Sequence, residues 1–155
     1  MEGNNIPRRA KVLVVGGGGR EHAIVDALSR SERVEKIFCA PGNAGIARQA
    51  KCVPLEDTQV DELAEFAENE GIDLTVVGPE VSLAAGIVDE FEARGLKIFG
   101  PSKAAARIES SKDFAKELMA KYNVPTAAYR TFSDYDEALA YVNAGKLPVV
   151  LKYDG

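Results

Sequence analysis

The residues with the clearest chemical potential are four consecutive glycines, Gly16 to Gly19, followed by Arg20. Glycine has no Cβ atom, so its backbone can adopt positive φ values and approach a ligand closely. A helix that begins near Arg20 would present free N–H groups and a favourable dipole to an anion, and the guanidinium would add charge-assisted hydrogen bonds. This pattern predicts a phosphate or carboxylate site, and a tight turn without a ligand is the alternative.

A dinucleotide-binding turn is the main rival, but its G-x-G-x-x-G signature does not fit this sequence. Counting from Gly16 places Glu21 at the third glycine position, and counting from Gly17 places His22 there. The acidic residue that would bind a ribose is also missing from residues 40–43. No G-K-[ST] follows the glycines, which excludes a P-loop.

Short apolar runs alternate with amphipathic segments between residues 11 and 101, which predicts an α/β fold with a parallel, doubly wound sheet. The loops at 16–20, 41–45 and 78–82 leave the carboxyl ends of strands and should converge on one crevice. The expected strands cover 11–15, 37–40, 51–53, 73–77 and 97–99, and the expected helices start at Arg20 or cover 60–67 and 83–91.

The pattern changes after Pro101. Helices are expected at 102–109, 114–122 and 134–142, with Ser110 and Ser111 as N-cap candidates, and strands at 129–132 and 148–152. A domain seldom ends on a strand whose partners are missing. The expected organisation is therefore a loose tail (1–10), a Rossmann-like domain (11–101), linker helices (102–124) and the beginning of a truncated second domain (125–155).

Composition narrows the function further. The net charge of −5 argues against a nucleic-acid partner, and no apolar run reaches the roughly 18 residues of a membrane span. Cys39 and Cys52 lack metal-like spacing and are expected to be reduced thiols, and no paired carboxylates with metal spacing are evident. These features favour a cytoplasmic protein that binds small molecules.

The ordered motifs of the chain resemble those of phosphoribosylamine–glycine ligases. The resemblance is carried in collinear order by residues 14–23, 41–45, 77–86, 98–102, 111–116 and 148–155. It implies an ATP-grasp enzyme in which a Rossmann-like pre-ATP-grasp domain is followed by the start of an ATP-grasp domain. The chain would then be about the first third of such a ligase.

The resemblance also implies a reaction in de novo purine biosynthesis. ATP phosphorylates the carboxylate of glycine, and the amine of 5-phosphoribosylamine attacks the glycyl phosphate, with Mg²⁺ or Mn²⁺ neutralising charge on the phosphates. The ATP lid, the metal ligands and most of the glycine site would lie beyond Gly155. The chain alone is therefore expected to hold no catalytic residue, to bind no cofactor tightly and to be inactive. A stand-alone anion or nucleotide binding module is the alternative.

Site residues follow from matching the family motifs. Gly18, Gly19 and Arg20 would hold the phosphate of phosphoribosylamine, and the side-chain oxygens of Glu21, Asn43 and Glu80 would accept hydrogen bonds from its ribose hydroxyls or amine. The alternatives are that Asn43 only caps a helix, that Glu80 and the two lysines are solvated, and that His22 is structural. The implied phosphoribosylamine site contains Gly17, Gly18, Gly19, Arg20, Glu21, Asn43, Gly45, Pro79 and Glu80, and the implied ATP site contains Lys112 and Lys152. Ser82 stands where the family usually has proline, and Tyr153 where it usually has a small residue.

Overall fold

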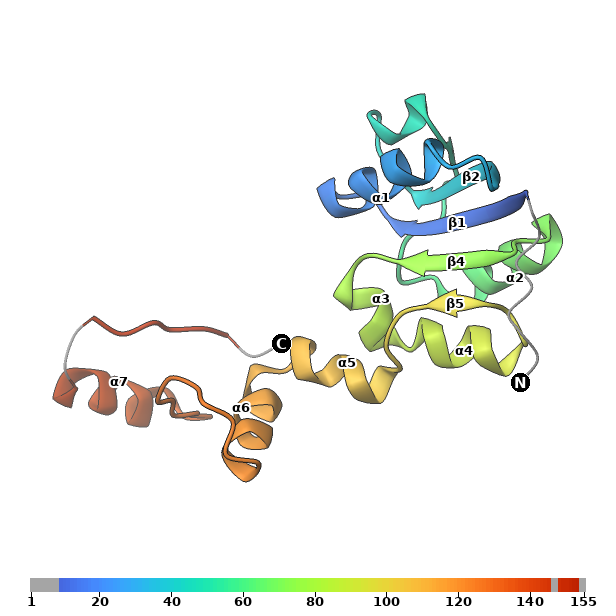
Figure 1. Cartoon of the computed structure of the whole chain (residues 1–155). Helices are drawn as coiled ribbons and strands as arrows, with labels where there is room; N and C mark the ends of the chain where they lie inside the picture. Colours follow the sequence, from blue (N-terminus) through green and yellow to red (C-terminus); the bar gives the residue numbers. More distant parts are fainter. Residues whose placement is uncertain (1–8, 146–147, 154–155) are drawn as a thin grey trace. The chain divides into compact units, whose positions relative to one another are not determined.

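The computed structural model of the chain describes residues 9–145 and 148–153. Five strands form one parallel sheet in the order β3-β2-β1-β4-β5 (Figure 1), which confirms the predicted α/β class. The strand order reverses beside β1, where ligands of such sheets characteristically bind. The strands are β1 (Ala10–Gly16), β2 (Val34–Pro41), β3 (Lys51–Cys52), β4 (Leu74–Val77) and β5 (Ile98–Phe99).

The helices between these strands follow the predicted spacing, with one interruption. The helix expected at 83–91 is two helices, because Gly86 adopts a left-handed φ of 101° and donates its N–H to the carbonyls of Ser82 and Leu83. Glycine tolerates this conformation, which ends a helix, better than any residue with a Cβ atom. The helices are α1 (Gly19–Ser29), the short 3₁₀ helix η1 (Ile46–Arg48), α2 (Val60–Glu70), α3 (Glu80–Ala85) and α4 (Ile87–Ala93).

Helices cover the two faces of the sheet because alternate residues of each strand point to opposite sides. Val14 packs with residues of α1 and η1, whereas Leu13 packs with residues of α2, α3 and α4. Both β1 side chains are fully buried, as the β-branched run of this central strand predicts. The carboxyl end of β1 is thus held in a rigid frame.

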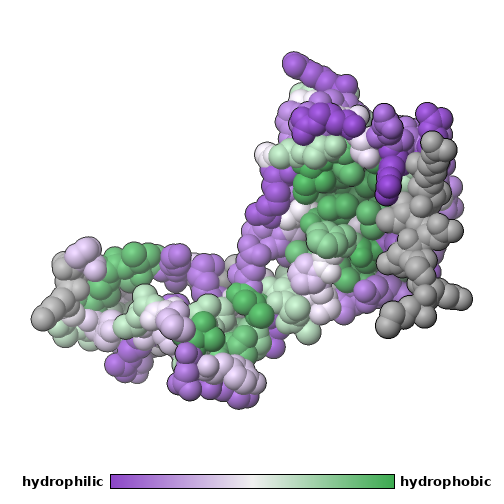
Figure 2. Space-filling view, in the orientation of Figure 1, coloured by the Kyte–Doolittle hydropathy of each residue, from purple (hydrophilic) through white to green (hydrophobic). Residues whose placement is uncertain are grey.

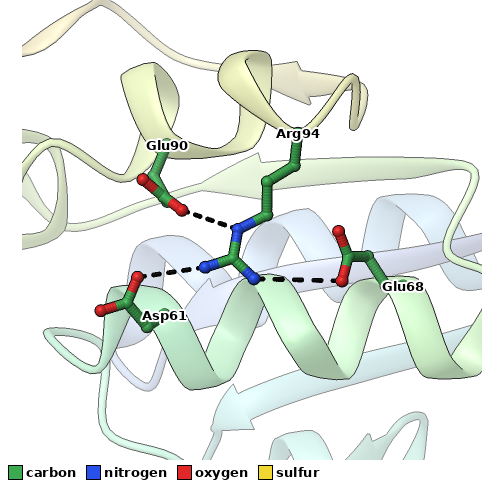
Figure 3. A network of polar contacts seen from close by, with 4 residues as sticks. All are labelled: Asp61, Glu68, Glu90 and Arg94. Carbon is green, nitrogen blue, oxygen red and sulfur yellow. Dashed lines mark hydrogen bonds and ion pairs between the residues drawn. The ribbon is translucent and has the colours of Figure 1, made fainter.

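An ion-pair network joins α2 to α4 on the Leu13 face of the sheet (Figure 3). The Arg94 guanidinium donates to Glu90 at 2.6 Å and Asp61 at 3.1 Å, and it lies 3.9 Å from Glu68. The hydrogen bond to Glu90 raises the pKa of Arg94. One side chain therefore links three carboxylates on two helices. The i,i+4 spacing predicts the pair with Glu90, but no local pattern predicts the pairs with Asp61 and Glu68.

The chain divides into two compact units, a first unit up to Ala106 and a second unit from Arg107. The helix α5 (Lys103–Ser110) contains the division, and α6 (Lys112–Lys121) and α7 (Tyr135–Ala144) belong to the second unit. The predicted cap at Ser111 is confirmed, because its hydroxyl accepts the N–H of Phe114 at 3.1 Å.

The two strands predicted for the second unit are wrong within the described residues. Segments 129–132 and 148–152 have no strand pairing there. An extended segment becomes a strand only when a neighbour accepts its backbone hydrogen bonds, so an apolar pattern alone cannot ensure pairing. Of the expected tail, residues 1–8 lie outside the described residues, and Ala10 already belongs to β1.

The second unit has little core of its own. Among its described residues, Ala115 is the one buried apolar side chain. Figure 2 shows apolar side chains on the surface of this unit. The large apolar side chains exposed there include Tyr122, Tyr135, Tyr141, Val150, Leu151 and Tyr153. Such exposure is typical of a segment that lacks packing partners.

Candidate anion site

The loops after β1 and β2 meet at the carboxyl edge of the sheet, as the topology predicts. Gly42 donates its N–H to the carbonyl of Gly16 at 3.2 Å, and the Asn43 amide donates to the carbonyl of Gly17 at 2.8 Å. A Cβ atom at Gly17 would lie only 2.6 Å from the carbonyl oxygen of Gly42. The close approach of the two loops therefore requires glycine at position 17.

Arg20 joins the loop after β4 to this pair. Its guanidinium donates to the carbonyl of Gly78 and lies 3.9 Å from the Glu80 carboxylate. The side chains of Arg20 and Glu80 are 60% and 50% exposed, so both remain accessible to a ligand. Pro79 is the N-cap residue of α3, and Glu80 is the first residue of that helix. The structure thus brings all three predicted loops together.

The amide groups of the glycine turn are not all available to a ligand. Gly18 donates its N–H to the Glu21 carboxylate at 2.6 Å, whereas His22 donates to the carbonyl of Gly18. Among the described residues, no acceptor is found for the N–H groups of Gly19, Arg20 and Glu21. These are the orphan donors of the first turn of α1, so the groups that could bind an anion begin one residue later than the glycine run suggests.

Asn43 and Gly45 organise the loop after β2. The Asn43 side-chain oxygen accepts the N–H of Gly45 at 2.8 Å and of Ile46 at 2.9 Å, so Asn43 caps η1 while its amide nitrogen holds Gly17. Asn43 itself is exposed. These bonds within the protein are of the kind that the capping alternative predicts, and a contact between Asn43 and a ligand stays a prediction.

His22 lies against this loop, although no sequence pattern predicts a place for it at the site. A Cβ atom at Gly45 would be 2.7 Å from Cε1 of the half-buried imidazole. Two residues of the first turn of α1 therefore reach different loops, Arg20 toward Gly78 and His22 toward Gly45. The glycine at position 45 indicates a close approach in the sequence, but it does not reveal which side chain approaches.

The two lysines of the implied ATP site belong to the second unit. Lys112 is the first residue of α6, and Lys152 lies in the extended segment 148–153, and both are exposed. Tyr153, one of the two departures from the family pattern, is 90% exposed. Ser82, the other departure, is fully buried in α3, and its hydroxyl has no hydrogen-bond partner in the described part of the chain.

The two thiols lie beneath the loops on paired positions of β2 and β3. Cys39 donates to the carbonyl of Gly16 at 3.2 Å and Cys52 to the carbonyl of Asn43 at 3.7 Å. Burial, with smaller contributions from Cys52 and Glu21, raises the pKa of Cys39 to about 12. Within residues 9–145 and 148–153 no group of three or more His, Cys, Asp or Glu side chains could hold a metal ion, and no helix could span a membrane.

The fold and the site together define a class of protein. At the point where the strand order reverses, an open parallel sheet carries a glycine turn, an exposed arginine and amide groups that have no acceptor within the described residues. This is the arrangement of a Rossmann-like α/β domain, with donors of a kind that suits an anion.

Comparison with known proteins gives the family. Residues 10–109 match the family model described as "Phosphoribosylglycinamide synthetase, N domain", and residues 110–155 match the one described as "Phosphoribosylglycinamide synthetase, ATP-grasp (A) domain". The chain belongs to the phosphoribosylglycinamide synthetase family, as its motifs predict.

The curated relatives that the chain matches are phosphoribosylamine–glycine ligases. The chain is 61% identical over 145 residues to the phosphoribosylamine–glycine ligase of Caldanaerobacter subterraneus subsp. tengcongensis, a match that covers 94% of this chain and 35% of the relative. It is 57% identical to the ligase of Neisseria meningitidis serogroup B, with coverage of 94% and 34%. The chain thus spans about a third of the length of the curated relatives it matches.

Solved structures agree with the fold. The crystal structure of phosphoribosylamine–glycine ligase from Thermotoga maritima matches with a TM-score of 0.52 and 32% identity, and covers 76% of this chain and 26% of that one. N5-carboxyaminoimidazole synthase from Aspergillus clavatus, solved with ADP and an aminoimidazole ribonucleotide, matches with a TM-score of 0.64 at 23% identity over 86% of this chain and 35% of that one. The second likeness concerns the fold alone.

Proposed function

We propose that this chain is the N-terminal part of a phosphoribosylamine–glycine ligase and that its first unit binds 5-phosphoribosylamine. The observation that carries the proposal is that the N–H groups of Gly19, Arg20 and Glu21, beside the exposed Arg20 guanidinium, have no acceptor within residues 9–145 and 148–153. Backbone donors, helix dipole and guanidinium all favour a phosphate. Membership of the family supplies the identity of the phosphate ester.

All residues of the predicted phosphoribosylamine site except Glu21 have a role in this proposal. The phosphate binds at the first turn of α1, where Gly18 and Gly19 are exposed, and Arg20 neutralises its charge. The exposed Glu80 carboxylate accepts hydrogen bonds from the ribose hydroxyls or the amine. The oxygen of Asn43 already accepts two backbone N–H groups, so its part is to donate its second amide hydrogen to the ribose. Gly17, Gly45 and Pro79 hold the three loops at the spacing this requires.

The complete ligase would join glycine to phosphoribosylamine and release ADP and phosphate. Lys112 and Lys152 are exposed cations that suit the phosphates of ATP, so they are the residues of this chain proposed to bind it. The described residues contain no acidic cluster that fits Mg²⁺ or Mn²⁺. Such a role in purine biosynthesis belongs to the cytoplasm, with small molecules as the partners.

The proposal is tested by calorimetry with ribose 5-phosphate. The wild-type chain should bind it, and Arg20→Ala should weaken binding by at least tenfold because a charge-assisted hydrogen bond contributes about 1.5–3 kcal/mol. Gly19→Val, which adds a branched side chain at the exposed start of α1, should also weaken binding. Arg30→Ala, an exposed pair with Asp26 at the other end of the helix, serves as the control. Unchanged binding in Arg20→Ala and Gly19→Val would refute the phosphate site.

Turnover needs a separate measurement, because the site for phosphoribosylamine lies within the first unit and the matched relatives are about three times longer. In a coupled ADP-release assay with ATP, glycine and phosphoribosylamine, the chain alone should show no ligation. Ligation by this chain would contradict the assignment of catalysis to the remaining part of the enzyme.

A further inference from the structure

The Glu21 carboxylate is buried inside the site instead of facing a ligand. Glu21 is 4% exposed, although it follows the exposed Arg20 at the start of α1. One carboxylate oxygen accepts the N–H of Gly18 at 2.6 Å, a charge-assisted hydrogen bond that offsets part of the cost of burying the charge. This carboxylate thus belongs to the interior of the glycine turn.

Glycines of two different loops leave the room that this carboxylate occupies. A Cβ atom at Gly16 would lie 2.8 Å from Cγ of Glu21, one at Gly18 would lie 2.9 Å from Oε2, and one at Gly78 would overlap Oε1. By contrast, a Cβ atom at Gly19 would meet no heavy atom within 4 Å. The packing of Glu21 therefore accounts for glycine at positions 18 and 78 without any ligand. At position 16 it acts together with the contact to Pro79 and the positive φ of 115°.

Glu21 and Arg20 both contact Gly78, which lies in the loop after β4. Arg20 donates to the carbonyl of Gly78, and Glu21 packs against the α-carbon side of the same residue. Two adjacent side chains of α1 therefore fix the loop after β4 relative to the glycine turn. A carboxylate in direct contact with a phosphate would repel it, whereas one buried behind the turn can orient the donors.

We propose that Glu21 is a positioning residue of the anion site, which holds the Gly16–Gly18 turn against Gly78 and thereby sets the N–H groups of Gly19 and Arg20 for a phosphate. Glu21 makes no contact with the ribose in this assignment. The inference rests on the proposed function, since it presupposes that an anion binds at this turn.

The test compares two probes, ribose 5-phosphate and inorganic phosphate, on wild type, Glu21→Ala and Glu21→Gln. Glu21→Ala should weaken both probes by the same factor, about tenfold or more, because the donors lose their alignment. Glu21→Gln keeps an oxygen acceptor for Gly18 and should restore most of the affinity. Ile87→Val is the control for a general loss of stability. Ile87 lies in the core on α4, far from the glycine turn in the sequence, so this substitution should leave both affinities within about twofold of the wild-type values.

Each outcome decides the assignment. Loss of affinity for ribose 5-phosphate alone would show that Glu21 contacts the ribose, and an unchanged affinity in Glu21→Ala would show that it positions nothing; both overturn the inference. An equal loss in Ile87→Val would reduce Glu21 to a stability role and would also overturn it. If wild type binds neither probe, the anion site itself is refuted, and the role of Glu21 with it.

Discussion

A single methyl group at Gly17 should separate the two loops that build the site. The Cβ atom of Gly17→Ala would lie 2.6 Å from the carbonyl oxygen of Gly42, which is backbone and cannot rotate away. The loops would have to move apart by several tenths of an ångström, and this would strain the Asn43–Gly17 and Gly42–Gly16 hydrogen bonds. Overpacking of this kind costs about 1–3 kcal/mol.

Gly19→Ala is the matched control, since it makes the same chemical change two residues away where no heavy atom lies within 4 Å. Gly19 is the first residue of α1, so alanine there should be neutral or stabilise by up to about 1 kcal/mol. Urea unfolding followed by circular dichroism measures both variants. A loss of about 1–3 kcal/mol in Gly17→Ala with none in Gly19→Ala is expected. Equal stabilities of the two variants would refute the claim that these loops are packed to contact.

Further predictions concern the core and its charges. Thr75→Val should raise the free energy of unfolding by roughly 1 kcal/mol, and the thermal midpoint with it, because the buried Thr75 hydroxyl has no partner in the described part of the chain. A lower midpoint would contradict this. Arg94→Lys should lower the midpoint in a salt-dependent way, since lysine cannot reproduce the fork to three carboxylates, whereas Arg30→Lys at an exposed pair should not; equal effects would count against the network. Cys39 has its pKa raised to about 12 when folded, so the unfolded thiol loses its proton first, and the stability of wild type relative to Cys39→Ala should be full at pH 8 and fall between about pH 9 and 12. A pH-independent difference in the free energy of unfolding would show that the thiol is not shielded.

The alternation of apolar runs was sufficient to predict the parallel sheet and the convergence of its loops, because buried strands and amphipathic helices leave periodic patterns. It did not predict the break at Gly86, since an isolated glycine within an apolar helical pattern has more than one structural outcome. It also predicted strands at 129–132 and 148–152, where pairing depends on neighbours that a local pattern does not contain.

The site was predictable in its location more than in its contacts. The glycine run indicated that some group approaches the backbone closely, and the expected group was a ligand. The structure shows that the Glu21 side chain approaches Gly16 and Gly18, and that the loop after β2 approaches Gly17. The contact between His22 and Gly45 and the Arg94 network join segments distant in the sequence. Such contacts depend on the folded arrangement and have no local signature.

The central claim is that the amides at the start of α1 bind a phosphate. Titration of the ¹⁵N-labelled chain with ribose 5-phosphate, followed by ¹H–¹⁵N correlation spectra, tests this most directly. The largest shifts should occur at the N–H groups of Gly19, Arg20 and Glu21, and the same groups should respond to inorganic phosphate. Shifts confined to other parts of the chain, or none at millimolar ligand, would contradict the account.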